Sequence, residues 1–286
     1  MARLLRRIAE EVLGLGKAVK VWSRIDIIGD IAVIKKPFAP DVTIEDLRLL
    51  GEELVRRFPY IRSVWLAASP VEGAYKTREY IHLAGEERSD TIYVEHGCRF
   101  HVDIRRVFIT PRLNYEHLRI ARLVGRGETI TNMFAGAGLF SIIIACKSSP
   151  RKVYSIDVNP HAYKFMIENV RLNRVEDVVE PILGDARDVV ESRLSGTSDR
   201  VLMPLPELAI EYLPYALEAL KKGRGVIHVY LHVHYAKGED PLEKSARLVA
   251  RRLEELDVSN YRISLVRRVR PVGPRTLQTV VDVVIA

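Results

Sequence analysis

Cysteine is scarce in this 286-residue sequence, which contains only Cys98 and Cys146. Neither belongs to a Cys-x-x-Cys pair, which argues against a disulfide framework and a zinc site and favours a reducing, cytoplasmic setting. Long apolar runs are missing too, so no membrane-spanning helix is expected. Residues 1–16 carry charges within their apolar pattern, and they predict an amphipathic helix rather than a secretory signal.

Acidic residues are outnumbered by basic ones. The chain has 44 Lys and Arg against 37 Asp and Glu, which gives a formal net charge of +7 and an isoelectric point of about 9.4. Such an excess is typical of proteins that bind polyanions, although many basic proteins bind none. The 48% of hydrophobic and 28% of charged residues are ordinary for a globular protein.

The first hundred residues predict a small α+β unit. One segment repeats apolar residues at helical spacing, and several shorter segments alternate apolar with polar residues. The helical segment begins after Thr43, which is a plausible N-cap because Asp46 follows three residues later. The predicted elements are two strands within residues 20–36, a helix over 42–59, a strand over 63–69 and two strands within 91–104, joined at a His96-Gly97 turn.

From about residue 106 onward, strands alternate with helices, and the sequence ends on two consecutive strands. One of the predicted helices covers residues 209–223, with Gly223 as its cap. The alternating order predicts an α/β fold, in which a doubly wound parallel sheet has helices on both faces. The final two strands predict an antiparallel edge on that sheet. We therefore expect two domains, residues 1–105 and residues 106–286.

A glycine-rich turn follows the first strand of the second domain. Gly136 and Gly138 would let the chain turn tightly and bring backbone N–H groups close to a ligand. Asp157 ends the next strand, where an acid can accept both ribose hydroxyls of a nucleoside. Asp185 follows the third strand, where an acid can accept from the exocyclic amine of adenine. Each feature alone is weak, because a plain turn or a helix cap would look the same.

The turn lacks the third glycine of dinucleotide-binding loops, since Ser141 stands at that position. The missing glycine and the second acid together favour S-adenosylmethionine (SAM) over NAD as the ligand.

Two further motifs flank this site. Residues 108–117, FITPRLNYEH, precede the sheet, and Met203-Pro-Leu-Pro206 ends its fourth strand, beside the expected ligand crevice. Together with IIGDIAVIK, LAGE, EHGCRFHVDI, NMFAGAGLFSI, IDVNPHA and LGDAR, they resemble the archaeal and eukaryotic tRNA (guanine-37-N1)-methyltransferases. The resemblance covers roughly residues 25–286. It implies a class I SAM-dependent methyltransferase fold, Rossmann-like, behind a small RNA-binding domain.

The resemblance also implies a monomeric enzyme that needs no metal. Its expected partner is the anticodon stem-loop of tRNA, and it is not expected to bind DNA or a membrane. Glu116 would be the general base and Arg112 an active-site cation. Guanine N1 must lose a proton before it attacks, and the negative charge that then builds on O6 calls for a cation. The expected SAM contacts are Phe134, Ala135, Gly136, Gly138, Asp157, Val158, Asp185, Ala186 and Pro204, and the expected substrate contacts are Arg78, Tyr115 and Pro206.

Two positions depart from the family pattern: Pro204 stands where Asn is usual, and His117 where Arg is usual. Because Pro204 has no side-chain hydrogen-bonding group and no N–H, guanine contacts there must come from backbone carbonyls or from elsewhere. The family often has an extra N-terminal domain for the tRNA elbow, and this chain is too short for it.

Several of these residues also have structural interpretations. Arg112 and Glu116 could form an i, i+4 ion pair, Tyr115 could pack between helix and sheet, and Arg78 could be a solvated charge. His228, His232 and His234 could ligate a metal but are more ordinary as residues on one face of a strand. A basic stretch could contact phosphates; it comprises Arg262, Arg267, Arg268, Arg270 and Arg275.

Three other functions stay open. A wyosine-pathway tRNA aminocarboxypropyltransferase uses the same fold and SAM, but Arg112 and Pro206 belong to motifs that those enzymes lack. A ribosomal RNA methyltransferase agrees less well with the N-terminal domain. A SAM-fold RNA-binding protein without catalysis would explain Pro204 but not Glu116.

Overall fold

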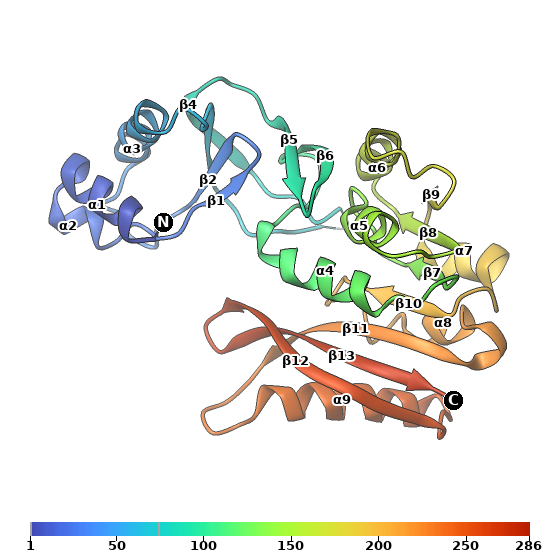
Figure 1. Cartoon of the computed structure of the whole chain (residues 1–286). Helices are drawn as coiled ribbons and strands as arrows, with labels where there is room; N and C mark the ends of the chain where they lie inside the picture. The colour runs from blue at the N-terminus through green and yellow to red at the C-terminus, as the bar shows by residue number, and fades with distance from the viewer. Residues whose placement is uncertain (1, 74) are drawn as a thin grey trace. The chain divides into compact units, whose positions relative to one another are not determined.

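The structure is a computed structural model that describes residues 2–73 and 75–286. The chain forms two compact units, Met1–Pro111 and Arg112–Ala286, which are described separately (Figure 1). Within the described residues, no helix is long and apolar enough to cross a membrane.

The first unit is built on a four-stranded sheet with the order β1-β2-β3-β4, in which only β2 and β3 run parallel. A separate antiparallel hairpin, β5–β6, turns at His96 and Gly97, both with positive φ, as two-residue hairpin turns require. The bounds are α1 (Ala2–Leu13), α2 (Leu15–Ala18), β1 (Asp26–Ile28), β2 (Ile31–Lys35), α3 (Ile44–Arg57), β3 (Ser63–Ala67), β4 (Tyr80–Gly85), β5 (Asp90–Glu95) and β6 (Cys98–Asp103).

Helix α3 begins and ends where its sequence predicts. Thr43 Oγ1 accepts from the Asp46 amide at 3.2 Å, and Asp46 Oδ2 accepts from the Thr43 amide at 2.9 Å, which completes a capping box. The helix stops before Phe58, because Pro59 follows and disfavours helical geometry in the residue before it. Strand β4 was not predicted.

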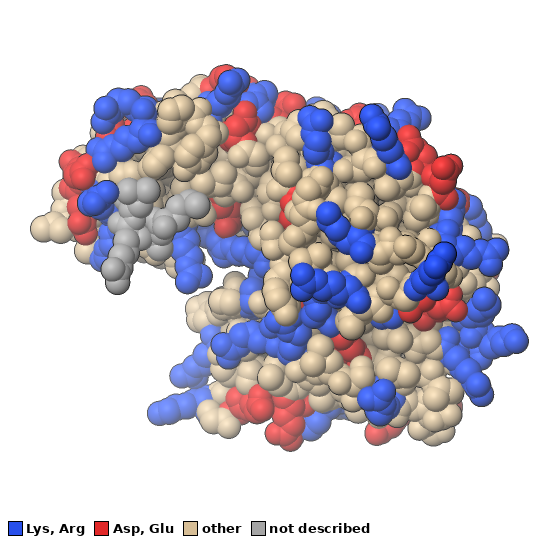
Figure 2. Space-filling view, viewed as in Figure 1, with Lys and Arg blue, Asp and Glu red and all other residues tan. Residues whose placement is uncertain are grey.

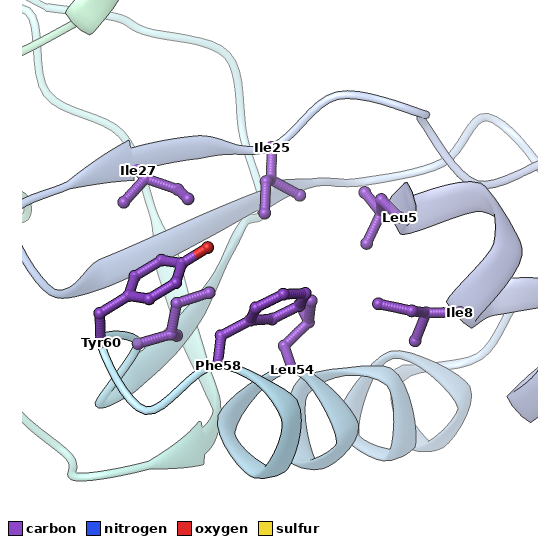
Figure 3. Close-up of a pocket in the computed structure, with 8 residues that line it drawn as sticks. Leu5, Ile8, Ile25, Ile27, Leu54, Phe58 and Tyr60 are labelled. Carbon is purple, nitrogen blue, oxygen red and sulfur yellow. The ribbon is translucent and has the colours of Figure 1, made fainter. Parts of the chain in front are cut away.

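An apolar pocket lies between α1, β1 and the end of α3 (Figure 3). Aliphatic side chains from these elements point into it, and the ring of Tyr60 stands at one side. Its lining residues are Leu5, Ile8, Ile25, Ile27, Leu54, Phe58, Tyr60 and Ile61.

The second unit contains a seven-stranded sheet with the order β12-β13-β11-β10-β7-β8-β9. Strands β11, β10, β7, β8 and β9 run parallel, and β13 and β12 add the expected antiparallel edge. The bounds are α4 (Asn114–Leu123), β7 (Thr129–Asn132), α5 (Leu139–Lys147), β8 (Lys152–Asp157), α6 (Pro160–Leu172), β9 (Val179–Leu183), α7 (Ala186–Val189), β10 (Arg200–Met203), α8 (Leu213–Glu218), β11 (Gly225–His234), α9 (Pro241–Glu255), β12 (Tyr261–Gly273) and β13 (Thr276–Ile285). The doubly wound α/β sheet with an antiparallel edge, as predicted from the sequence, is confirmed.

The two faces of β11 and β13 differ in chemistry because side chains alternate along a strand. Val229 and Val281 belong to the apolar core, which also includes Val249 and Leu253 of α9. The intervening residues of these strands, among them His228 and Asp282, face the other way. In Figure 1, α4 and α9 lie on opposite sides of these strands.

The helix predicted over residues 209–223, with Gly223 as its cap, is wrong in extent. Helix α8 covers only Leu213–Glu218, and Gly223 belongs to a separate 3₁₀ turn. The physical reason for the late start is Pro214, which fits only the first turn of a helix.

Candidate active site

The glycine turn between β7 and α5 is tight and open on one side. Gly136 and Gly138 have φ of 57° and 91°, the left-handed region that suits glycine. A Cβ built on Gly138 would lie 3.0 Å from Met166 Cγ, so this glycine allows close packing of the turn. A Cβ on Gly136 would meet no atom within 4 Å. The turn therefore leaves free space beside its backbone at Gly136.

Asp157, at the end of β8, braces this turn. Its Oδ2 accepts from the Gly136 amide at 2.7 Å and its Oδ1 from the Asn159 amide at 2.9 Å. Burial raises the pKa of Asp157. The two backbone hydrogen bonds lower that pKa by a smaller amount, so it stays above its ordinary value. Each carboxylate oxygen keeps a second lone pair that can accept from a ligand hydroxyl.

Asp185, after β9, caps α7 and also reaches across to α8. Its Oδ1 accepts from the Arg187 amide at 2.8 Å, and its Oδ2 accepts from the Tyr212 hydroxyl at 2.8 Å. Burial, followed by the hydrogen bond to Asp185, raises the pKa of Tyr212 to about 12. The Tyr212 ring contacts Phe134 edge to face, with 5.4 Å between centroids. Tyr212 thus links two expected SAM contacts.

These residues fit a nucleoside such as SAM. They stand at the carboxyl ends of β7, β8 and β9, beside the point where the strand order reverses between β7 and β10. Asn132, the last residue of β7, is buried, and within the described part of the chain its Oδ1 has no hydrogen-bond partner. A buried acceptor of this kind still has its hydrogen-bonding capacity unused.

The remaining expected SAM contacts lie at the ends of β7, β8, β9 and β10. Ala135 and Ala186 are buried, and Val158, which follows Asp157, is 46% exposed. Pro204 directly follows β10, and Pro206, an expected substrate contact, comes two residues later; both are half-buried.

Glu116 lies on the first turn of α4 with only 2% of its surface exposed. Its Oε2 accepts from Arg119 Nε at 2.9 Å and from the Tyr230 hydroxyl at 3.1 Å. Its Oε1 accepts from Arg267 Nη1 at 2.5 Å. A buried carboxylate with this many donors is held in one orientation.

A chain of buried charges continues behind Glu116. Arg119 Nη1 donates to Asp282 Oδ2 at 2.6 Å, and His228 Nδ1 donates to Asp282 Oδ1 at 2.6 Å. Because Arg200 Nη1 donates to His228 Nε2 at 2.7 Å, that nitrogen is the acceptor, which fixes the tautomer of the neutral ring. Arg200 also pairs with Glu128 at 2.8 Å.

The electrostatics of this chain favour an ionised acid and a neutral histidine. Burial lowers the pKa of His228 below its ordinary value. Burial would raise the pKa of Asp282, but hydrogen bonds and charges from His228 and Arg119 outweigh it and hold that pKa at about 2. We name Glu116, Arg119, His228, Arg200 and Asp282 the buried charge chain.

Tyr115 is not packed between helix and sheet, since 63% of its surface is exposed. The Arg267 guanidinium lies over its ring, with Cζ 4.4 Å from the centroid. Arg112 is half-buried at the start of the second unit, and Arg78 is half-buried in the first unit, just before β4.

The three histidines of β11 do not share one role. His228 belongs to the buried charge chain, His232 Nδ1 lies 3.8 Å from a Glu207 carboxylate oxygen, and His234 Nδ1 is 3.2 Å from Thr276 Oγ1. Across residues 2–73 and 75–286, no three metal-ligating side chains gather in one cluster.

Sequence reasoning singled out Glu116 but missed its partner Arg119, the acid Asp282 that pairs with Arg119, and the role of Arg267. One signal was available: Asp282 is the only charged residue in the apolar run TLQTVVDVVI. An acid in a buried strand must be paired, so it marks the presence of a cation on that face.

This chain is similar in sequence to known proteins. The family model described as the TRM5/TYW2 methyltransferase domain matches residues 91–259. The tRNA 4-demethylwyosine(37)-methyltransferase Taw21 of Saccharolobus solfataricus is 43% identical over 92% of this chain and 94% of its own length. The tRNA (guanine(37)-N(1))-methyltransferase Trm5b of Pyrococcus abyssi is 40% identical over 72% of this chain, which spans 58% of that longer protein.

Solved structures agree with these matches. The complex of aTrm5 and tRNALeu superposes with a TM-score of 0.84 at 30% identity, covering 99% of this chain and 78% of that chain. Methanocaldococcus jannaschii TYW2 in complex with AdoMet superposes with a TM-score of 0.65 at 27% identity, covering 91% of this chain and 98% of that one.

Proposed function

The chain belongs to the TRM5/TYW2 methyltransferase family, whose members are SAM-dependent transferases, and we propose that it methylates nucleoside 37 of tRNA. We take N1 of guanine as the acceptor atom. The observation that carries this choice is the buried carboxylate of Glu116, held by Arg119, Tyr230 and Arg267.

Methylation of guanine N1 requires a base with a fixed position. Glu116 takes the N1 proton within hydrogen-bond reach, and the electron pair of the broken N–H bond stays on the guanine. Its burial and its several donors hold the carboxylate in place, so little reorganisation is needed at the moment of reaction. Bound SAM supplies a methyl carbon on a sulfonium, a leaving group that needs no protonation.

The other site residues bind and orient. Asp157 accepts the ribose hydroxyls, Asp185 accepts from the adenine amine, and the open side of Gly136 leaves room for the nucleoside. Asn132 Oδ1 accepts from a polar N–H of the same ligand. Arg112 stabilises charge on the guanine, and Tyr115, exposed at the start of α4, stacks on the flipped base.

The first unit is proposed to bind RNA, with Arg78 as a phosphate contact. At the end of β10, Pro204 leaves guanine recognition to backbone carbonyls, because a proline offers neither a side-chain donor nor an N–H.

A second substrate has its own support. The relative that is 43% identical over nearly the full length of both chains is named a 4-demethylwyosine(37)-methyltransferase. We therefore propose 4-demethylwyosine at position 37 as an alternative or additional acceptor.

The test uses methyl-labelled SAM with three substrates: a G37 tRNA transcript, an A37 transcript and tRNA that carries 4-demethylwyosine. After digestion, N1-methylguanosine from G37 and no labelled product from A37 are expected. The Glu116→Gln variant is expected to lower the rate on G37 by about 10²- to 10⁴-fold. Glu255→Gln removes an exposed, ion-paired glutamate of the same unit and serves as the matched control, with an unchanged rate.

Other outcomes would change the assignment. Label found only on 4-demethylwyosine would make that nucleoside the substrate. Transfer from carboxyl-labelled SAM, without methyl transfer, would identify an aminocarboxypropyltransferase. SAM binding without transfer of either label would leave an RNA-binding protein without catalysis.

A further inference from the structure

Arg267 contacts Glu116, the proposed general base, from a strand near the end of the sequence. It lies on β12 directly across from Val280 of β13, which in turn lies across from Tyr230 of β11. Residues that are directly opposite share a face of the sheet, so Arg267 and Tyr230 both point toward α4. Nη1 of Arg267 donates to Glu116 Oε1, at a separation of 151 residues in the sequence.

The two oxygens of Glu116 have different surroundings. Oε2 accepts from Arg119 and Tyr230, whose side chains are almost wholly buried. Oε1 accepts from Arg267, whose side chain is 29% exposed. A substrate can approach only from the exposed side, so Oε1 is the oxygen that meets it.

Tyr115 fixes the orientation of Arg267. The guanidinium lies over the exposed tyrosine ring, 4.4 Å from its centroid, while it remains bonded to Glu116. A guanidinium is planar and presents its five N–H donors in a rigid fork. The contacts with Glu116 and Tyr115 therefore hold the Arg267 guanidinium beside Glu116 Oε1. Its other N–H groups can still donate to a ligand.

The chemistry of guanine matches this arrangement, because N1–H and O6 stand on adjacent ring atoms. When Glu116 Oε1 takes the N1 proton, the N–H bond breaks and its electron pair is shared between N1 and O6. A guanidinium already bonded to Oε1 has a neighbouring N–H within reach of O6.

We propose that Arg267 is a further catalytic residue, which donates a hydrogen bond to O6 of the target guanine and stabilises its negative charge while Glu116 takes the N1 proton. This inference rests on the proposed guanine N1 methylation. Arg267 and Arg112 would then be two cations that act on the same guanine.

The test compares single-turnover rates at saturating tRNA and SAM for the wild type, Arg267→Gln, Arg267→Lys and Arg251→Gln. Arg251 is the matched control: its side chain is 80% exposed and pairs with Glu255 within α9. Both Gln variants remove one positive charge from the second unit. Calorimetry with SAM checks that each variant is folded.

We expect Arg267→Gln to lower the rate by about 10²- to 10³-fold with a tRNA Kd within about threefold of the wild type. Arg267→Lys should recover part of the loss because it keeps the charge. Arg251→Gln should leave the rate unchanged. A tRNA with 6-thioguanine at position 37, whose sulfur is a weak acceptor, should shrink the wild-type to Arg267→Gln rate ratio by about tenfold.

Three results would overturn the proposal. If Arg267→Gln affects only the tRNA Kd, as a phosphate contact would, Arg267 is not catalytic. If the rate loss is the same with guanine and 6-thioguanine, Arg267 acts only by positioning Glu116. If the wild type does not methylate G37, the proposed function itself fails, and this shows before any variant is compared.

Discussion

Asp282 is the residue on which the buried charges of the second unit converge. It accepts from Arg119 at 2.6 Å and from His228 at 2.6 Å, and only 4% of its surface is exposed. Buried charges of this kind offset their desolvation only while all partners are present. The removal of one partner leaves the others uncompensated.

We therefore predict that Asp282→Asn lowers the free energy of unfolding by about 3 kcal/mol or more at neutral pH. The measurement is urea unfolding, followed by fluorescence. Asp188→Asn is the control, because Asp188 is an exposed acid that pairs with Arg187, and such pairs contribute about 1 kcal/mol or less. Equal losses in the two variants would show that the buried charge chain does not stabilise the fold.

His228 makes stability depend on pH. Its pKa in the folded state lies below the ordinary value of 6.5 because of burial, so below pH 6.5 the unfolded state takes up a proton that the folded state does not. Stability therefore falls as the pH drops from 6.5 toward the folded pKa, by up to about 1.4 kcal/mol per pH unit.

The comparison is between the wild type and His228→Gln, in urea unfolding at pH 7.5 and pH 5.5. We expect the variant to be less stable at pH 7.5 but to lose less stability between the two values. A wild type whose unfolding midpoint is the same at both values would contradict the burial of a neutral His228.

Single residues were predictable where a motif fixes their position. Glu116, Asp157 and Asp185 stand in short segments whose spacing from a strand end can be read in the sequence. Arg267 and Asp282 could not be assigned in this way, because Glu116 lies 151 residues from Arg267 and Arg119 lies 163 residues from Asp282. Which face of β12 carries Arg267 depends on its register with β13, and that register includes bulges that no local pattern reveals.

At the scale of elements, the β7–α5 turn contains two glycines with different tasks. Gly136→Ala adds a methyl group where no atom lies within 4 Å, so the fold loses only the backbone cost of positive φ, about 1–2 kcal/mol. The methyl group fills the space proposed for SAM, and we expect the SAM affinity to fall by more than about tenfold. Isothermal calorimetry measures this.

Gly138→Ala is the matched comparison, because its Cβ would lie 3.0 Å from Met166 and 3.1 Å from Ile142. This variant should lose more thermal stability than Gly136→Ala. If Gly136→Ala keeps wild-type SAM affinity, the nucleoside does not lie beside this turn.

Elements with a strong local signal formed as predicted. The capping residues of α3 and the turn of the β5–β6 hairpin act through neighbours in sequence, so the sequence is enough. Strand β4 was missed because half of it is only partly buried and its pairing with β3 decides its conformation. Helix α8 shows the reverse case, in which one proline overrides a longer helical pattern.

At the scale of the whole molecule, the net charge of +7 should dominate the affinity for RNA. Figure 2 shows Lys and Arg side chains over much of the visible face of the second unit, with Asp and Glu between them. We predict that the tRNA Kd rises about 100-fold between about 50 and 200 mM salt, as about four phosphate contacts would require. The SAM Kd, measured in the same buffers, should change by less than about threefold, since a buried site is screened little. A tRNA affinity that is independent of salt would exclude phosphate contacts as its main source.

The overall α/β order was predictable because strand and helix periods alternate regularly along the second unit. The position of the last two strands was also predictable as an edge pair, but their contribution to the site was not. That contribution depends on side chains meeting across α4, β11, β13 and β12, which is a property of the packed molecule.

The late position of Arg267 and Asp282 in the chain also orders events during synthesis. The glycine turn, Asp157 and Asp185 leave the ribosome well before β12 and β13 do. Only β12 and β13 supply Arg267, which bonds to the Glu116 carboxylate, and Asp282, which holds Arg119. A chain whose translation stops before β12 would contain the nucleoside-binding segments but would lack the groups that hold the Glu116 carboxylate in place. Chemical competence of this protein is therefore expected to arise at the end of translation, so prematurely terminated products would not modify the tRNA pool.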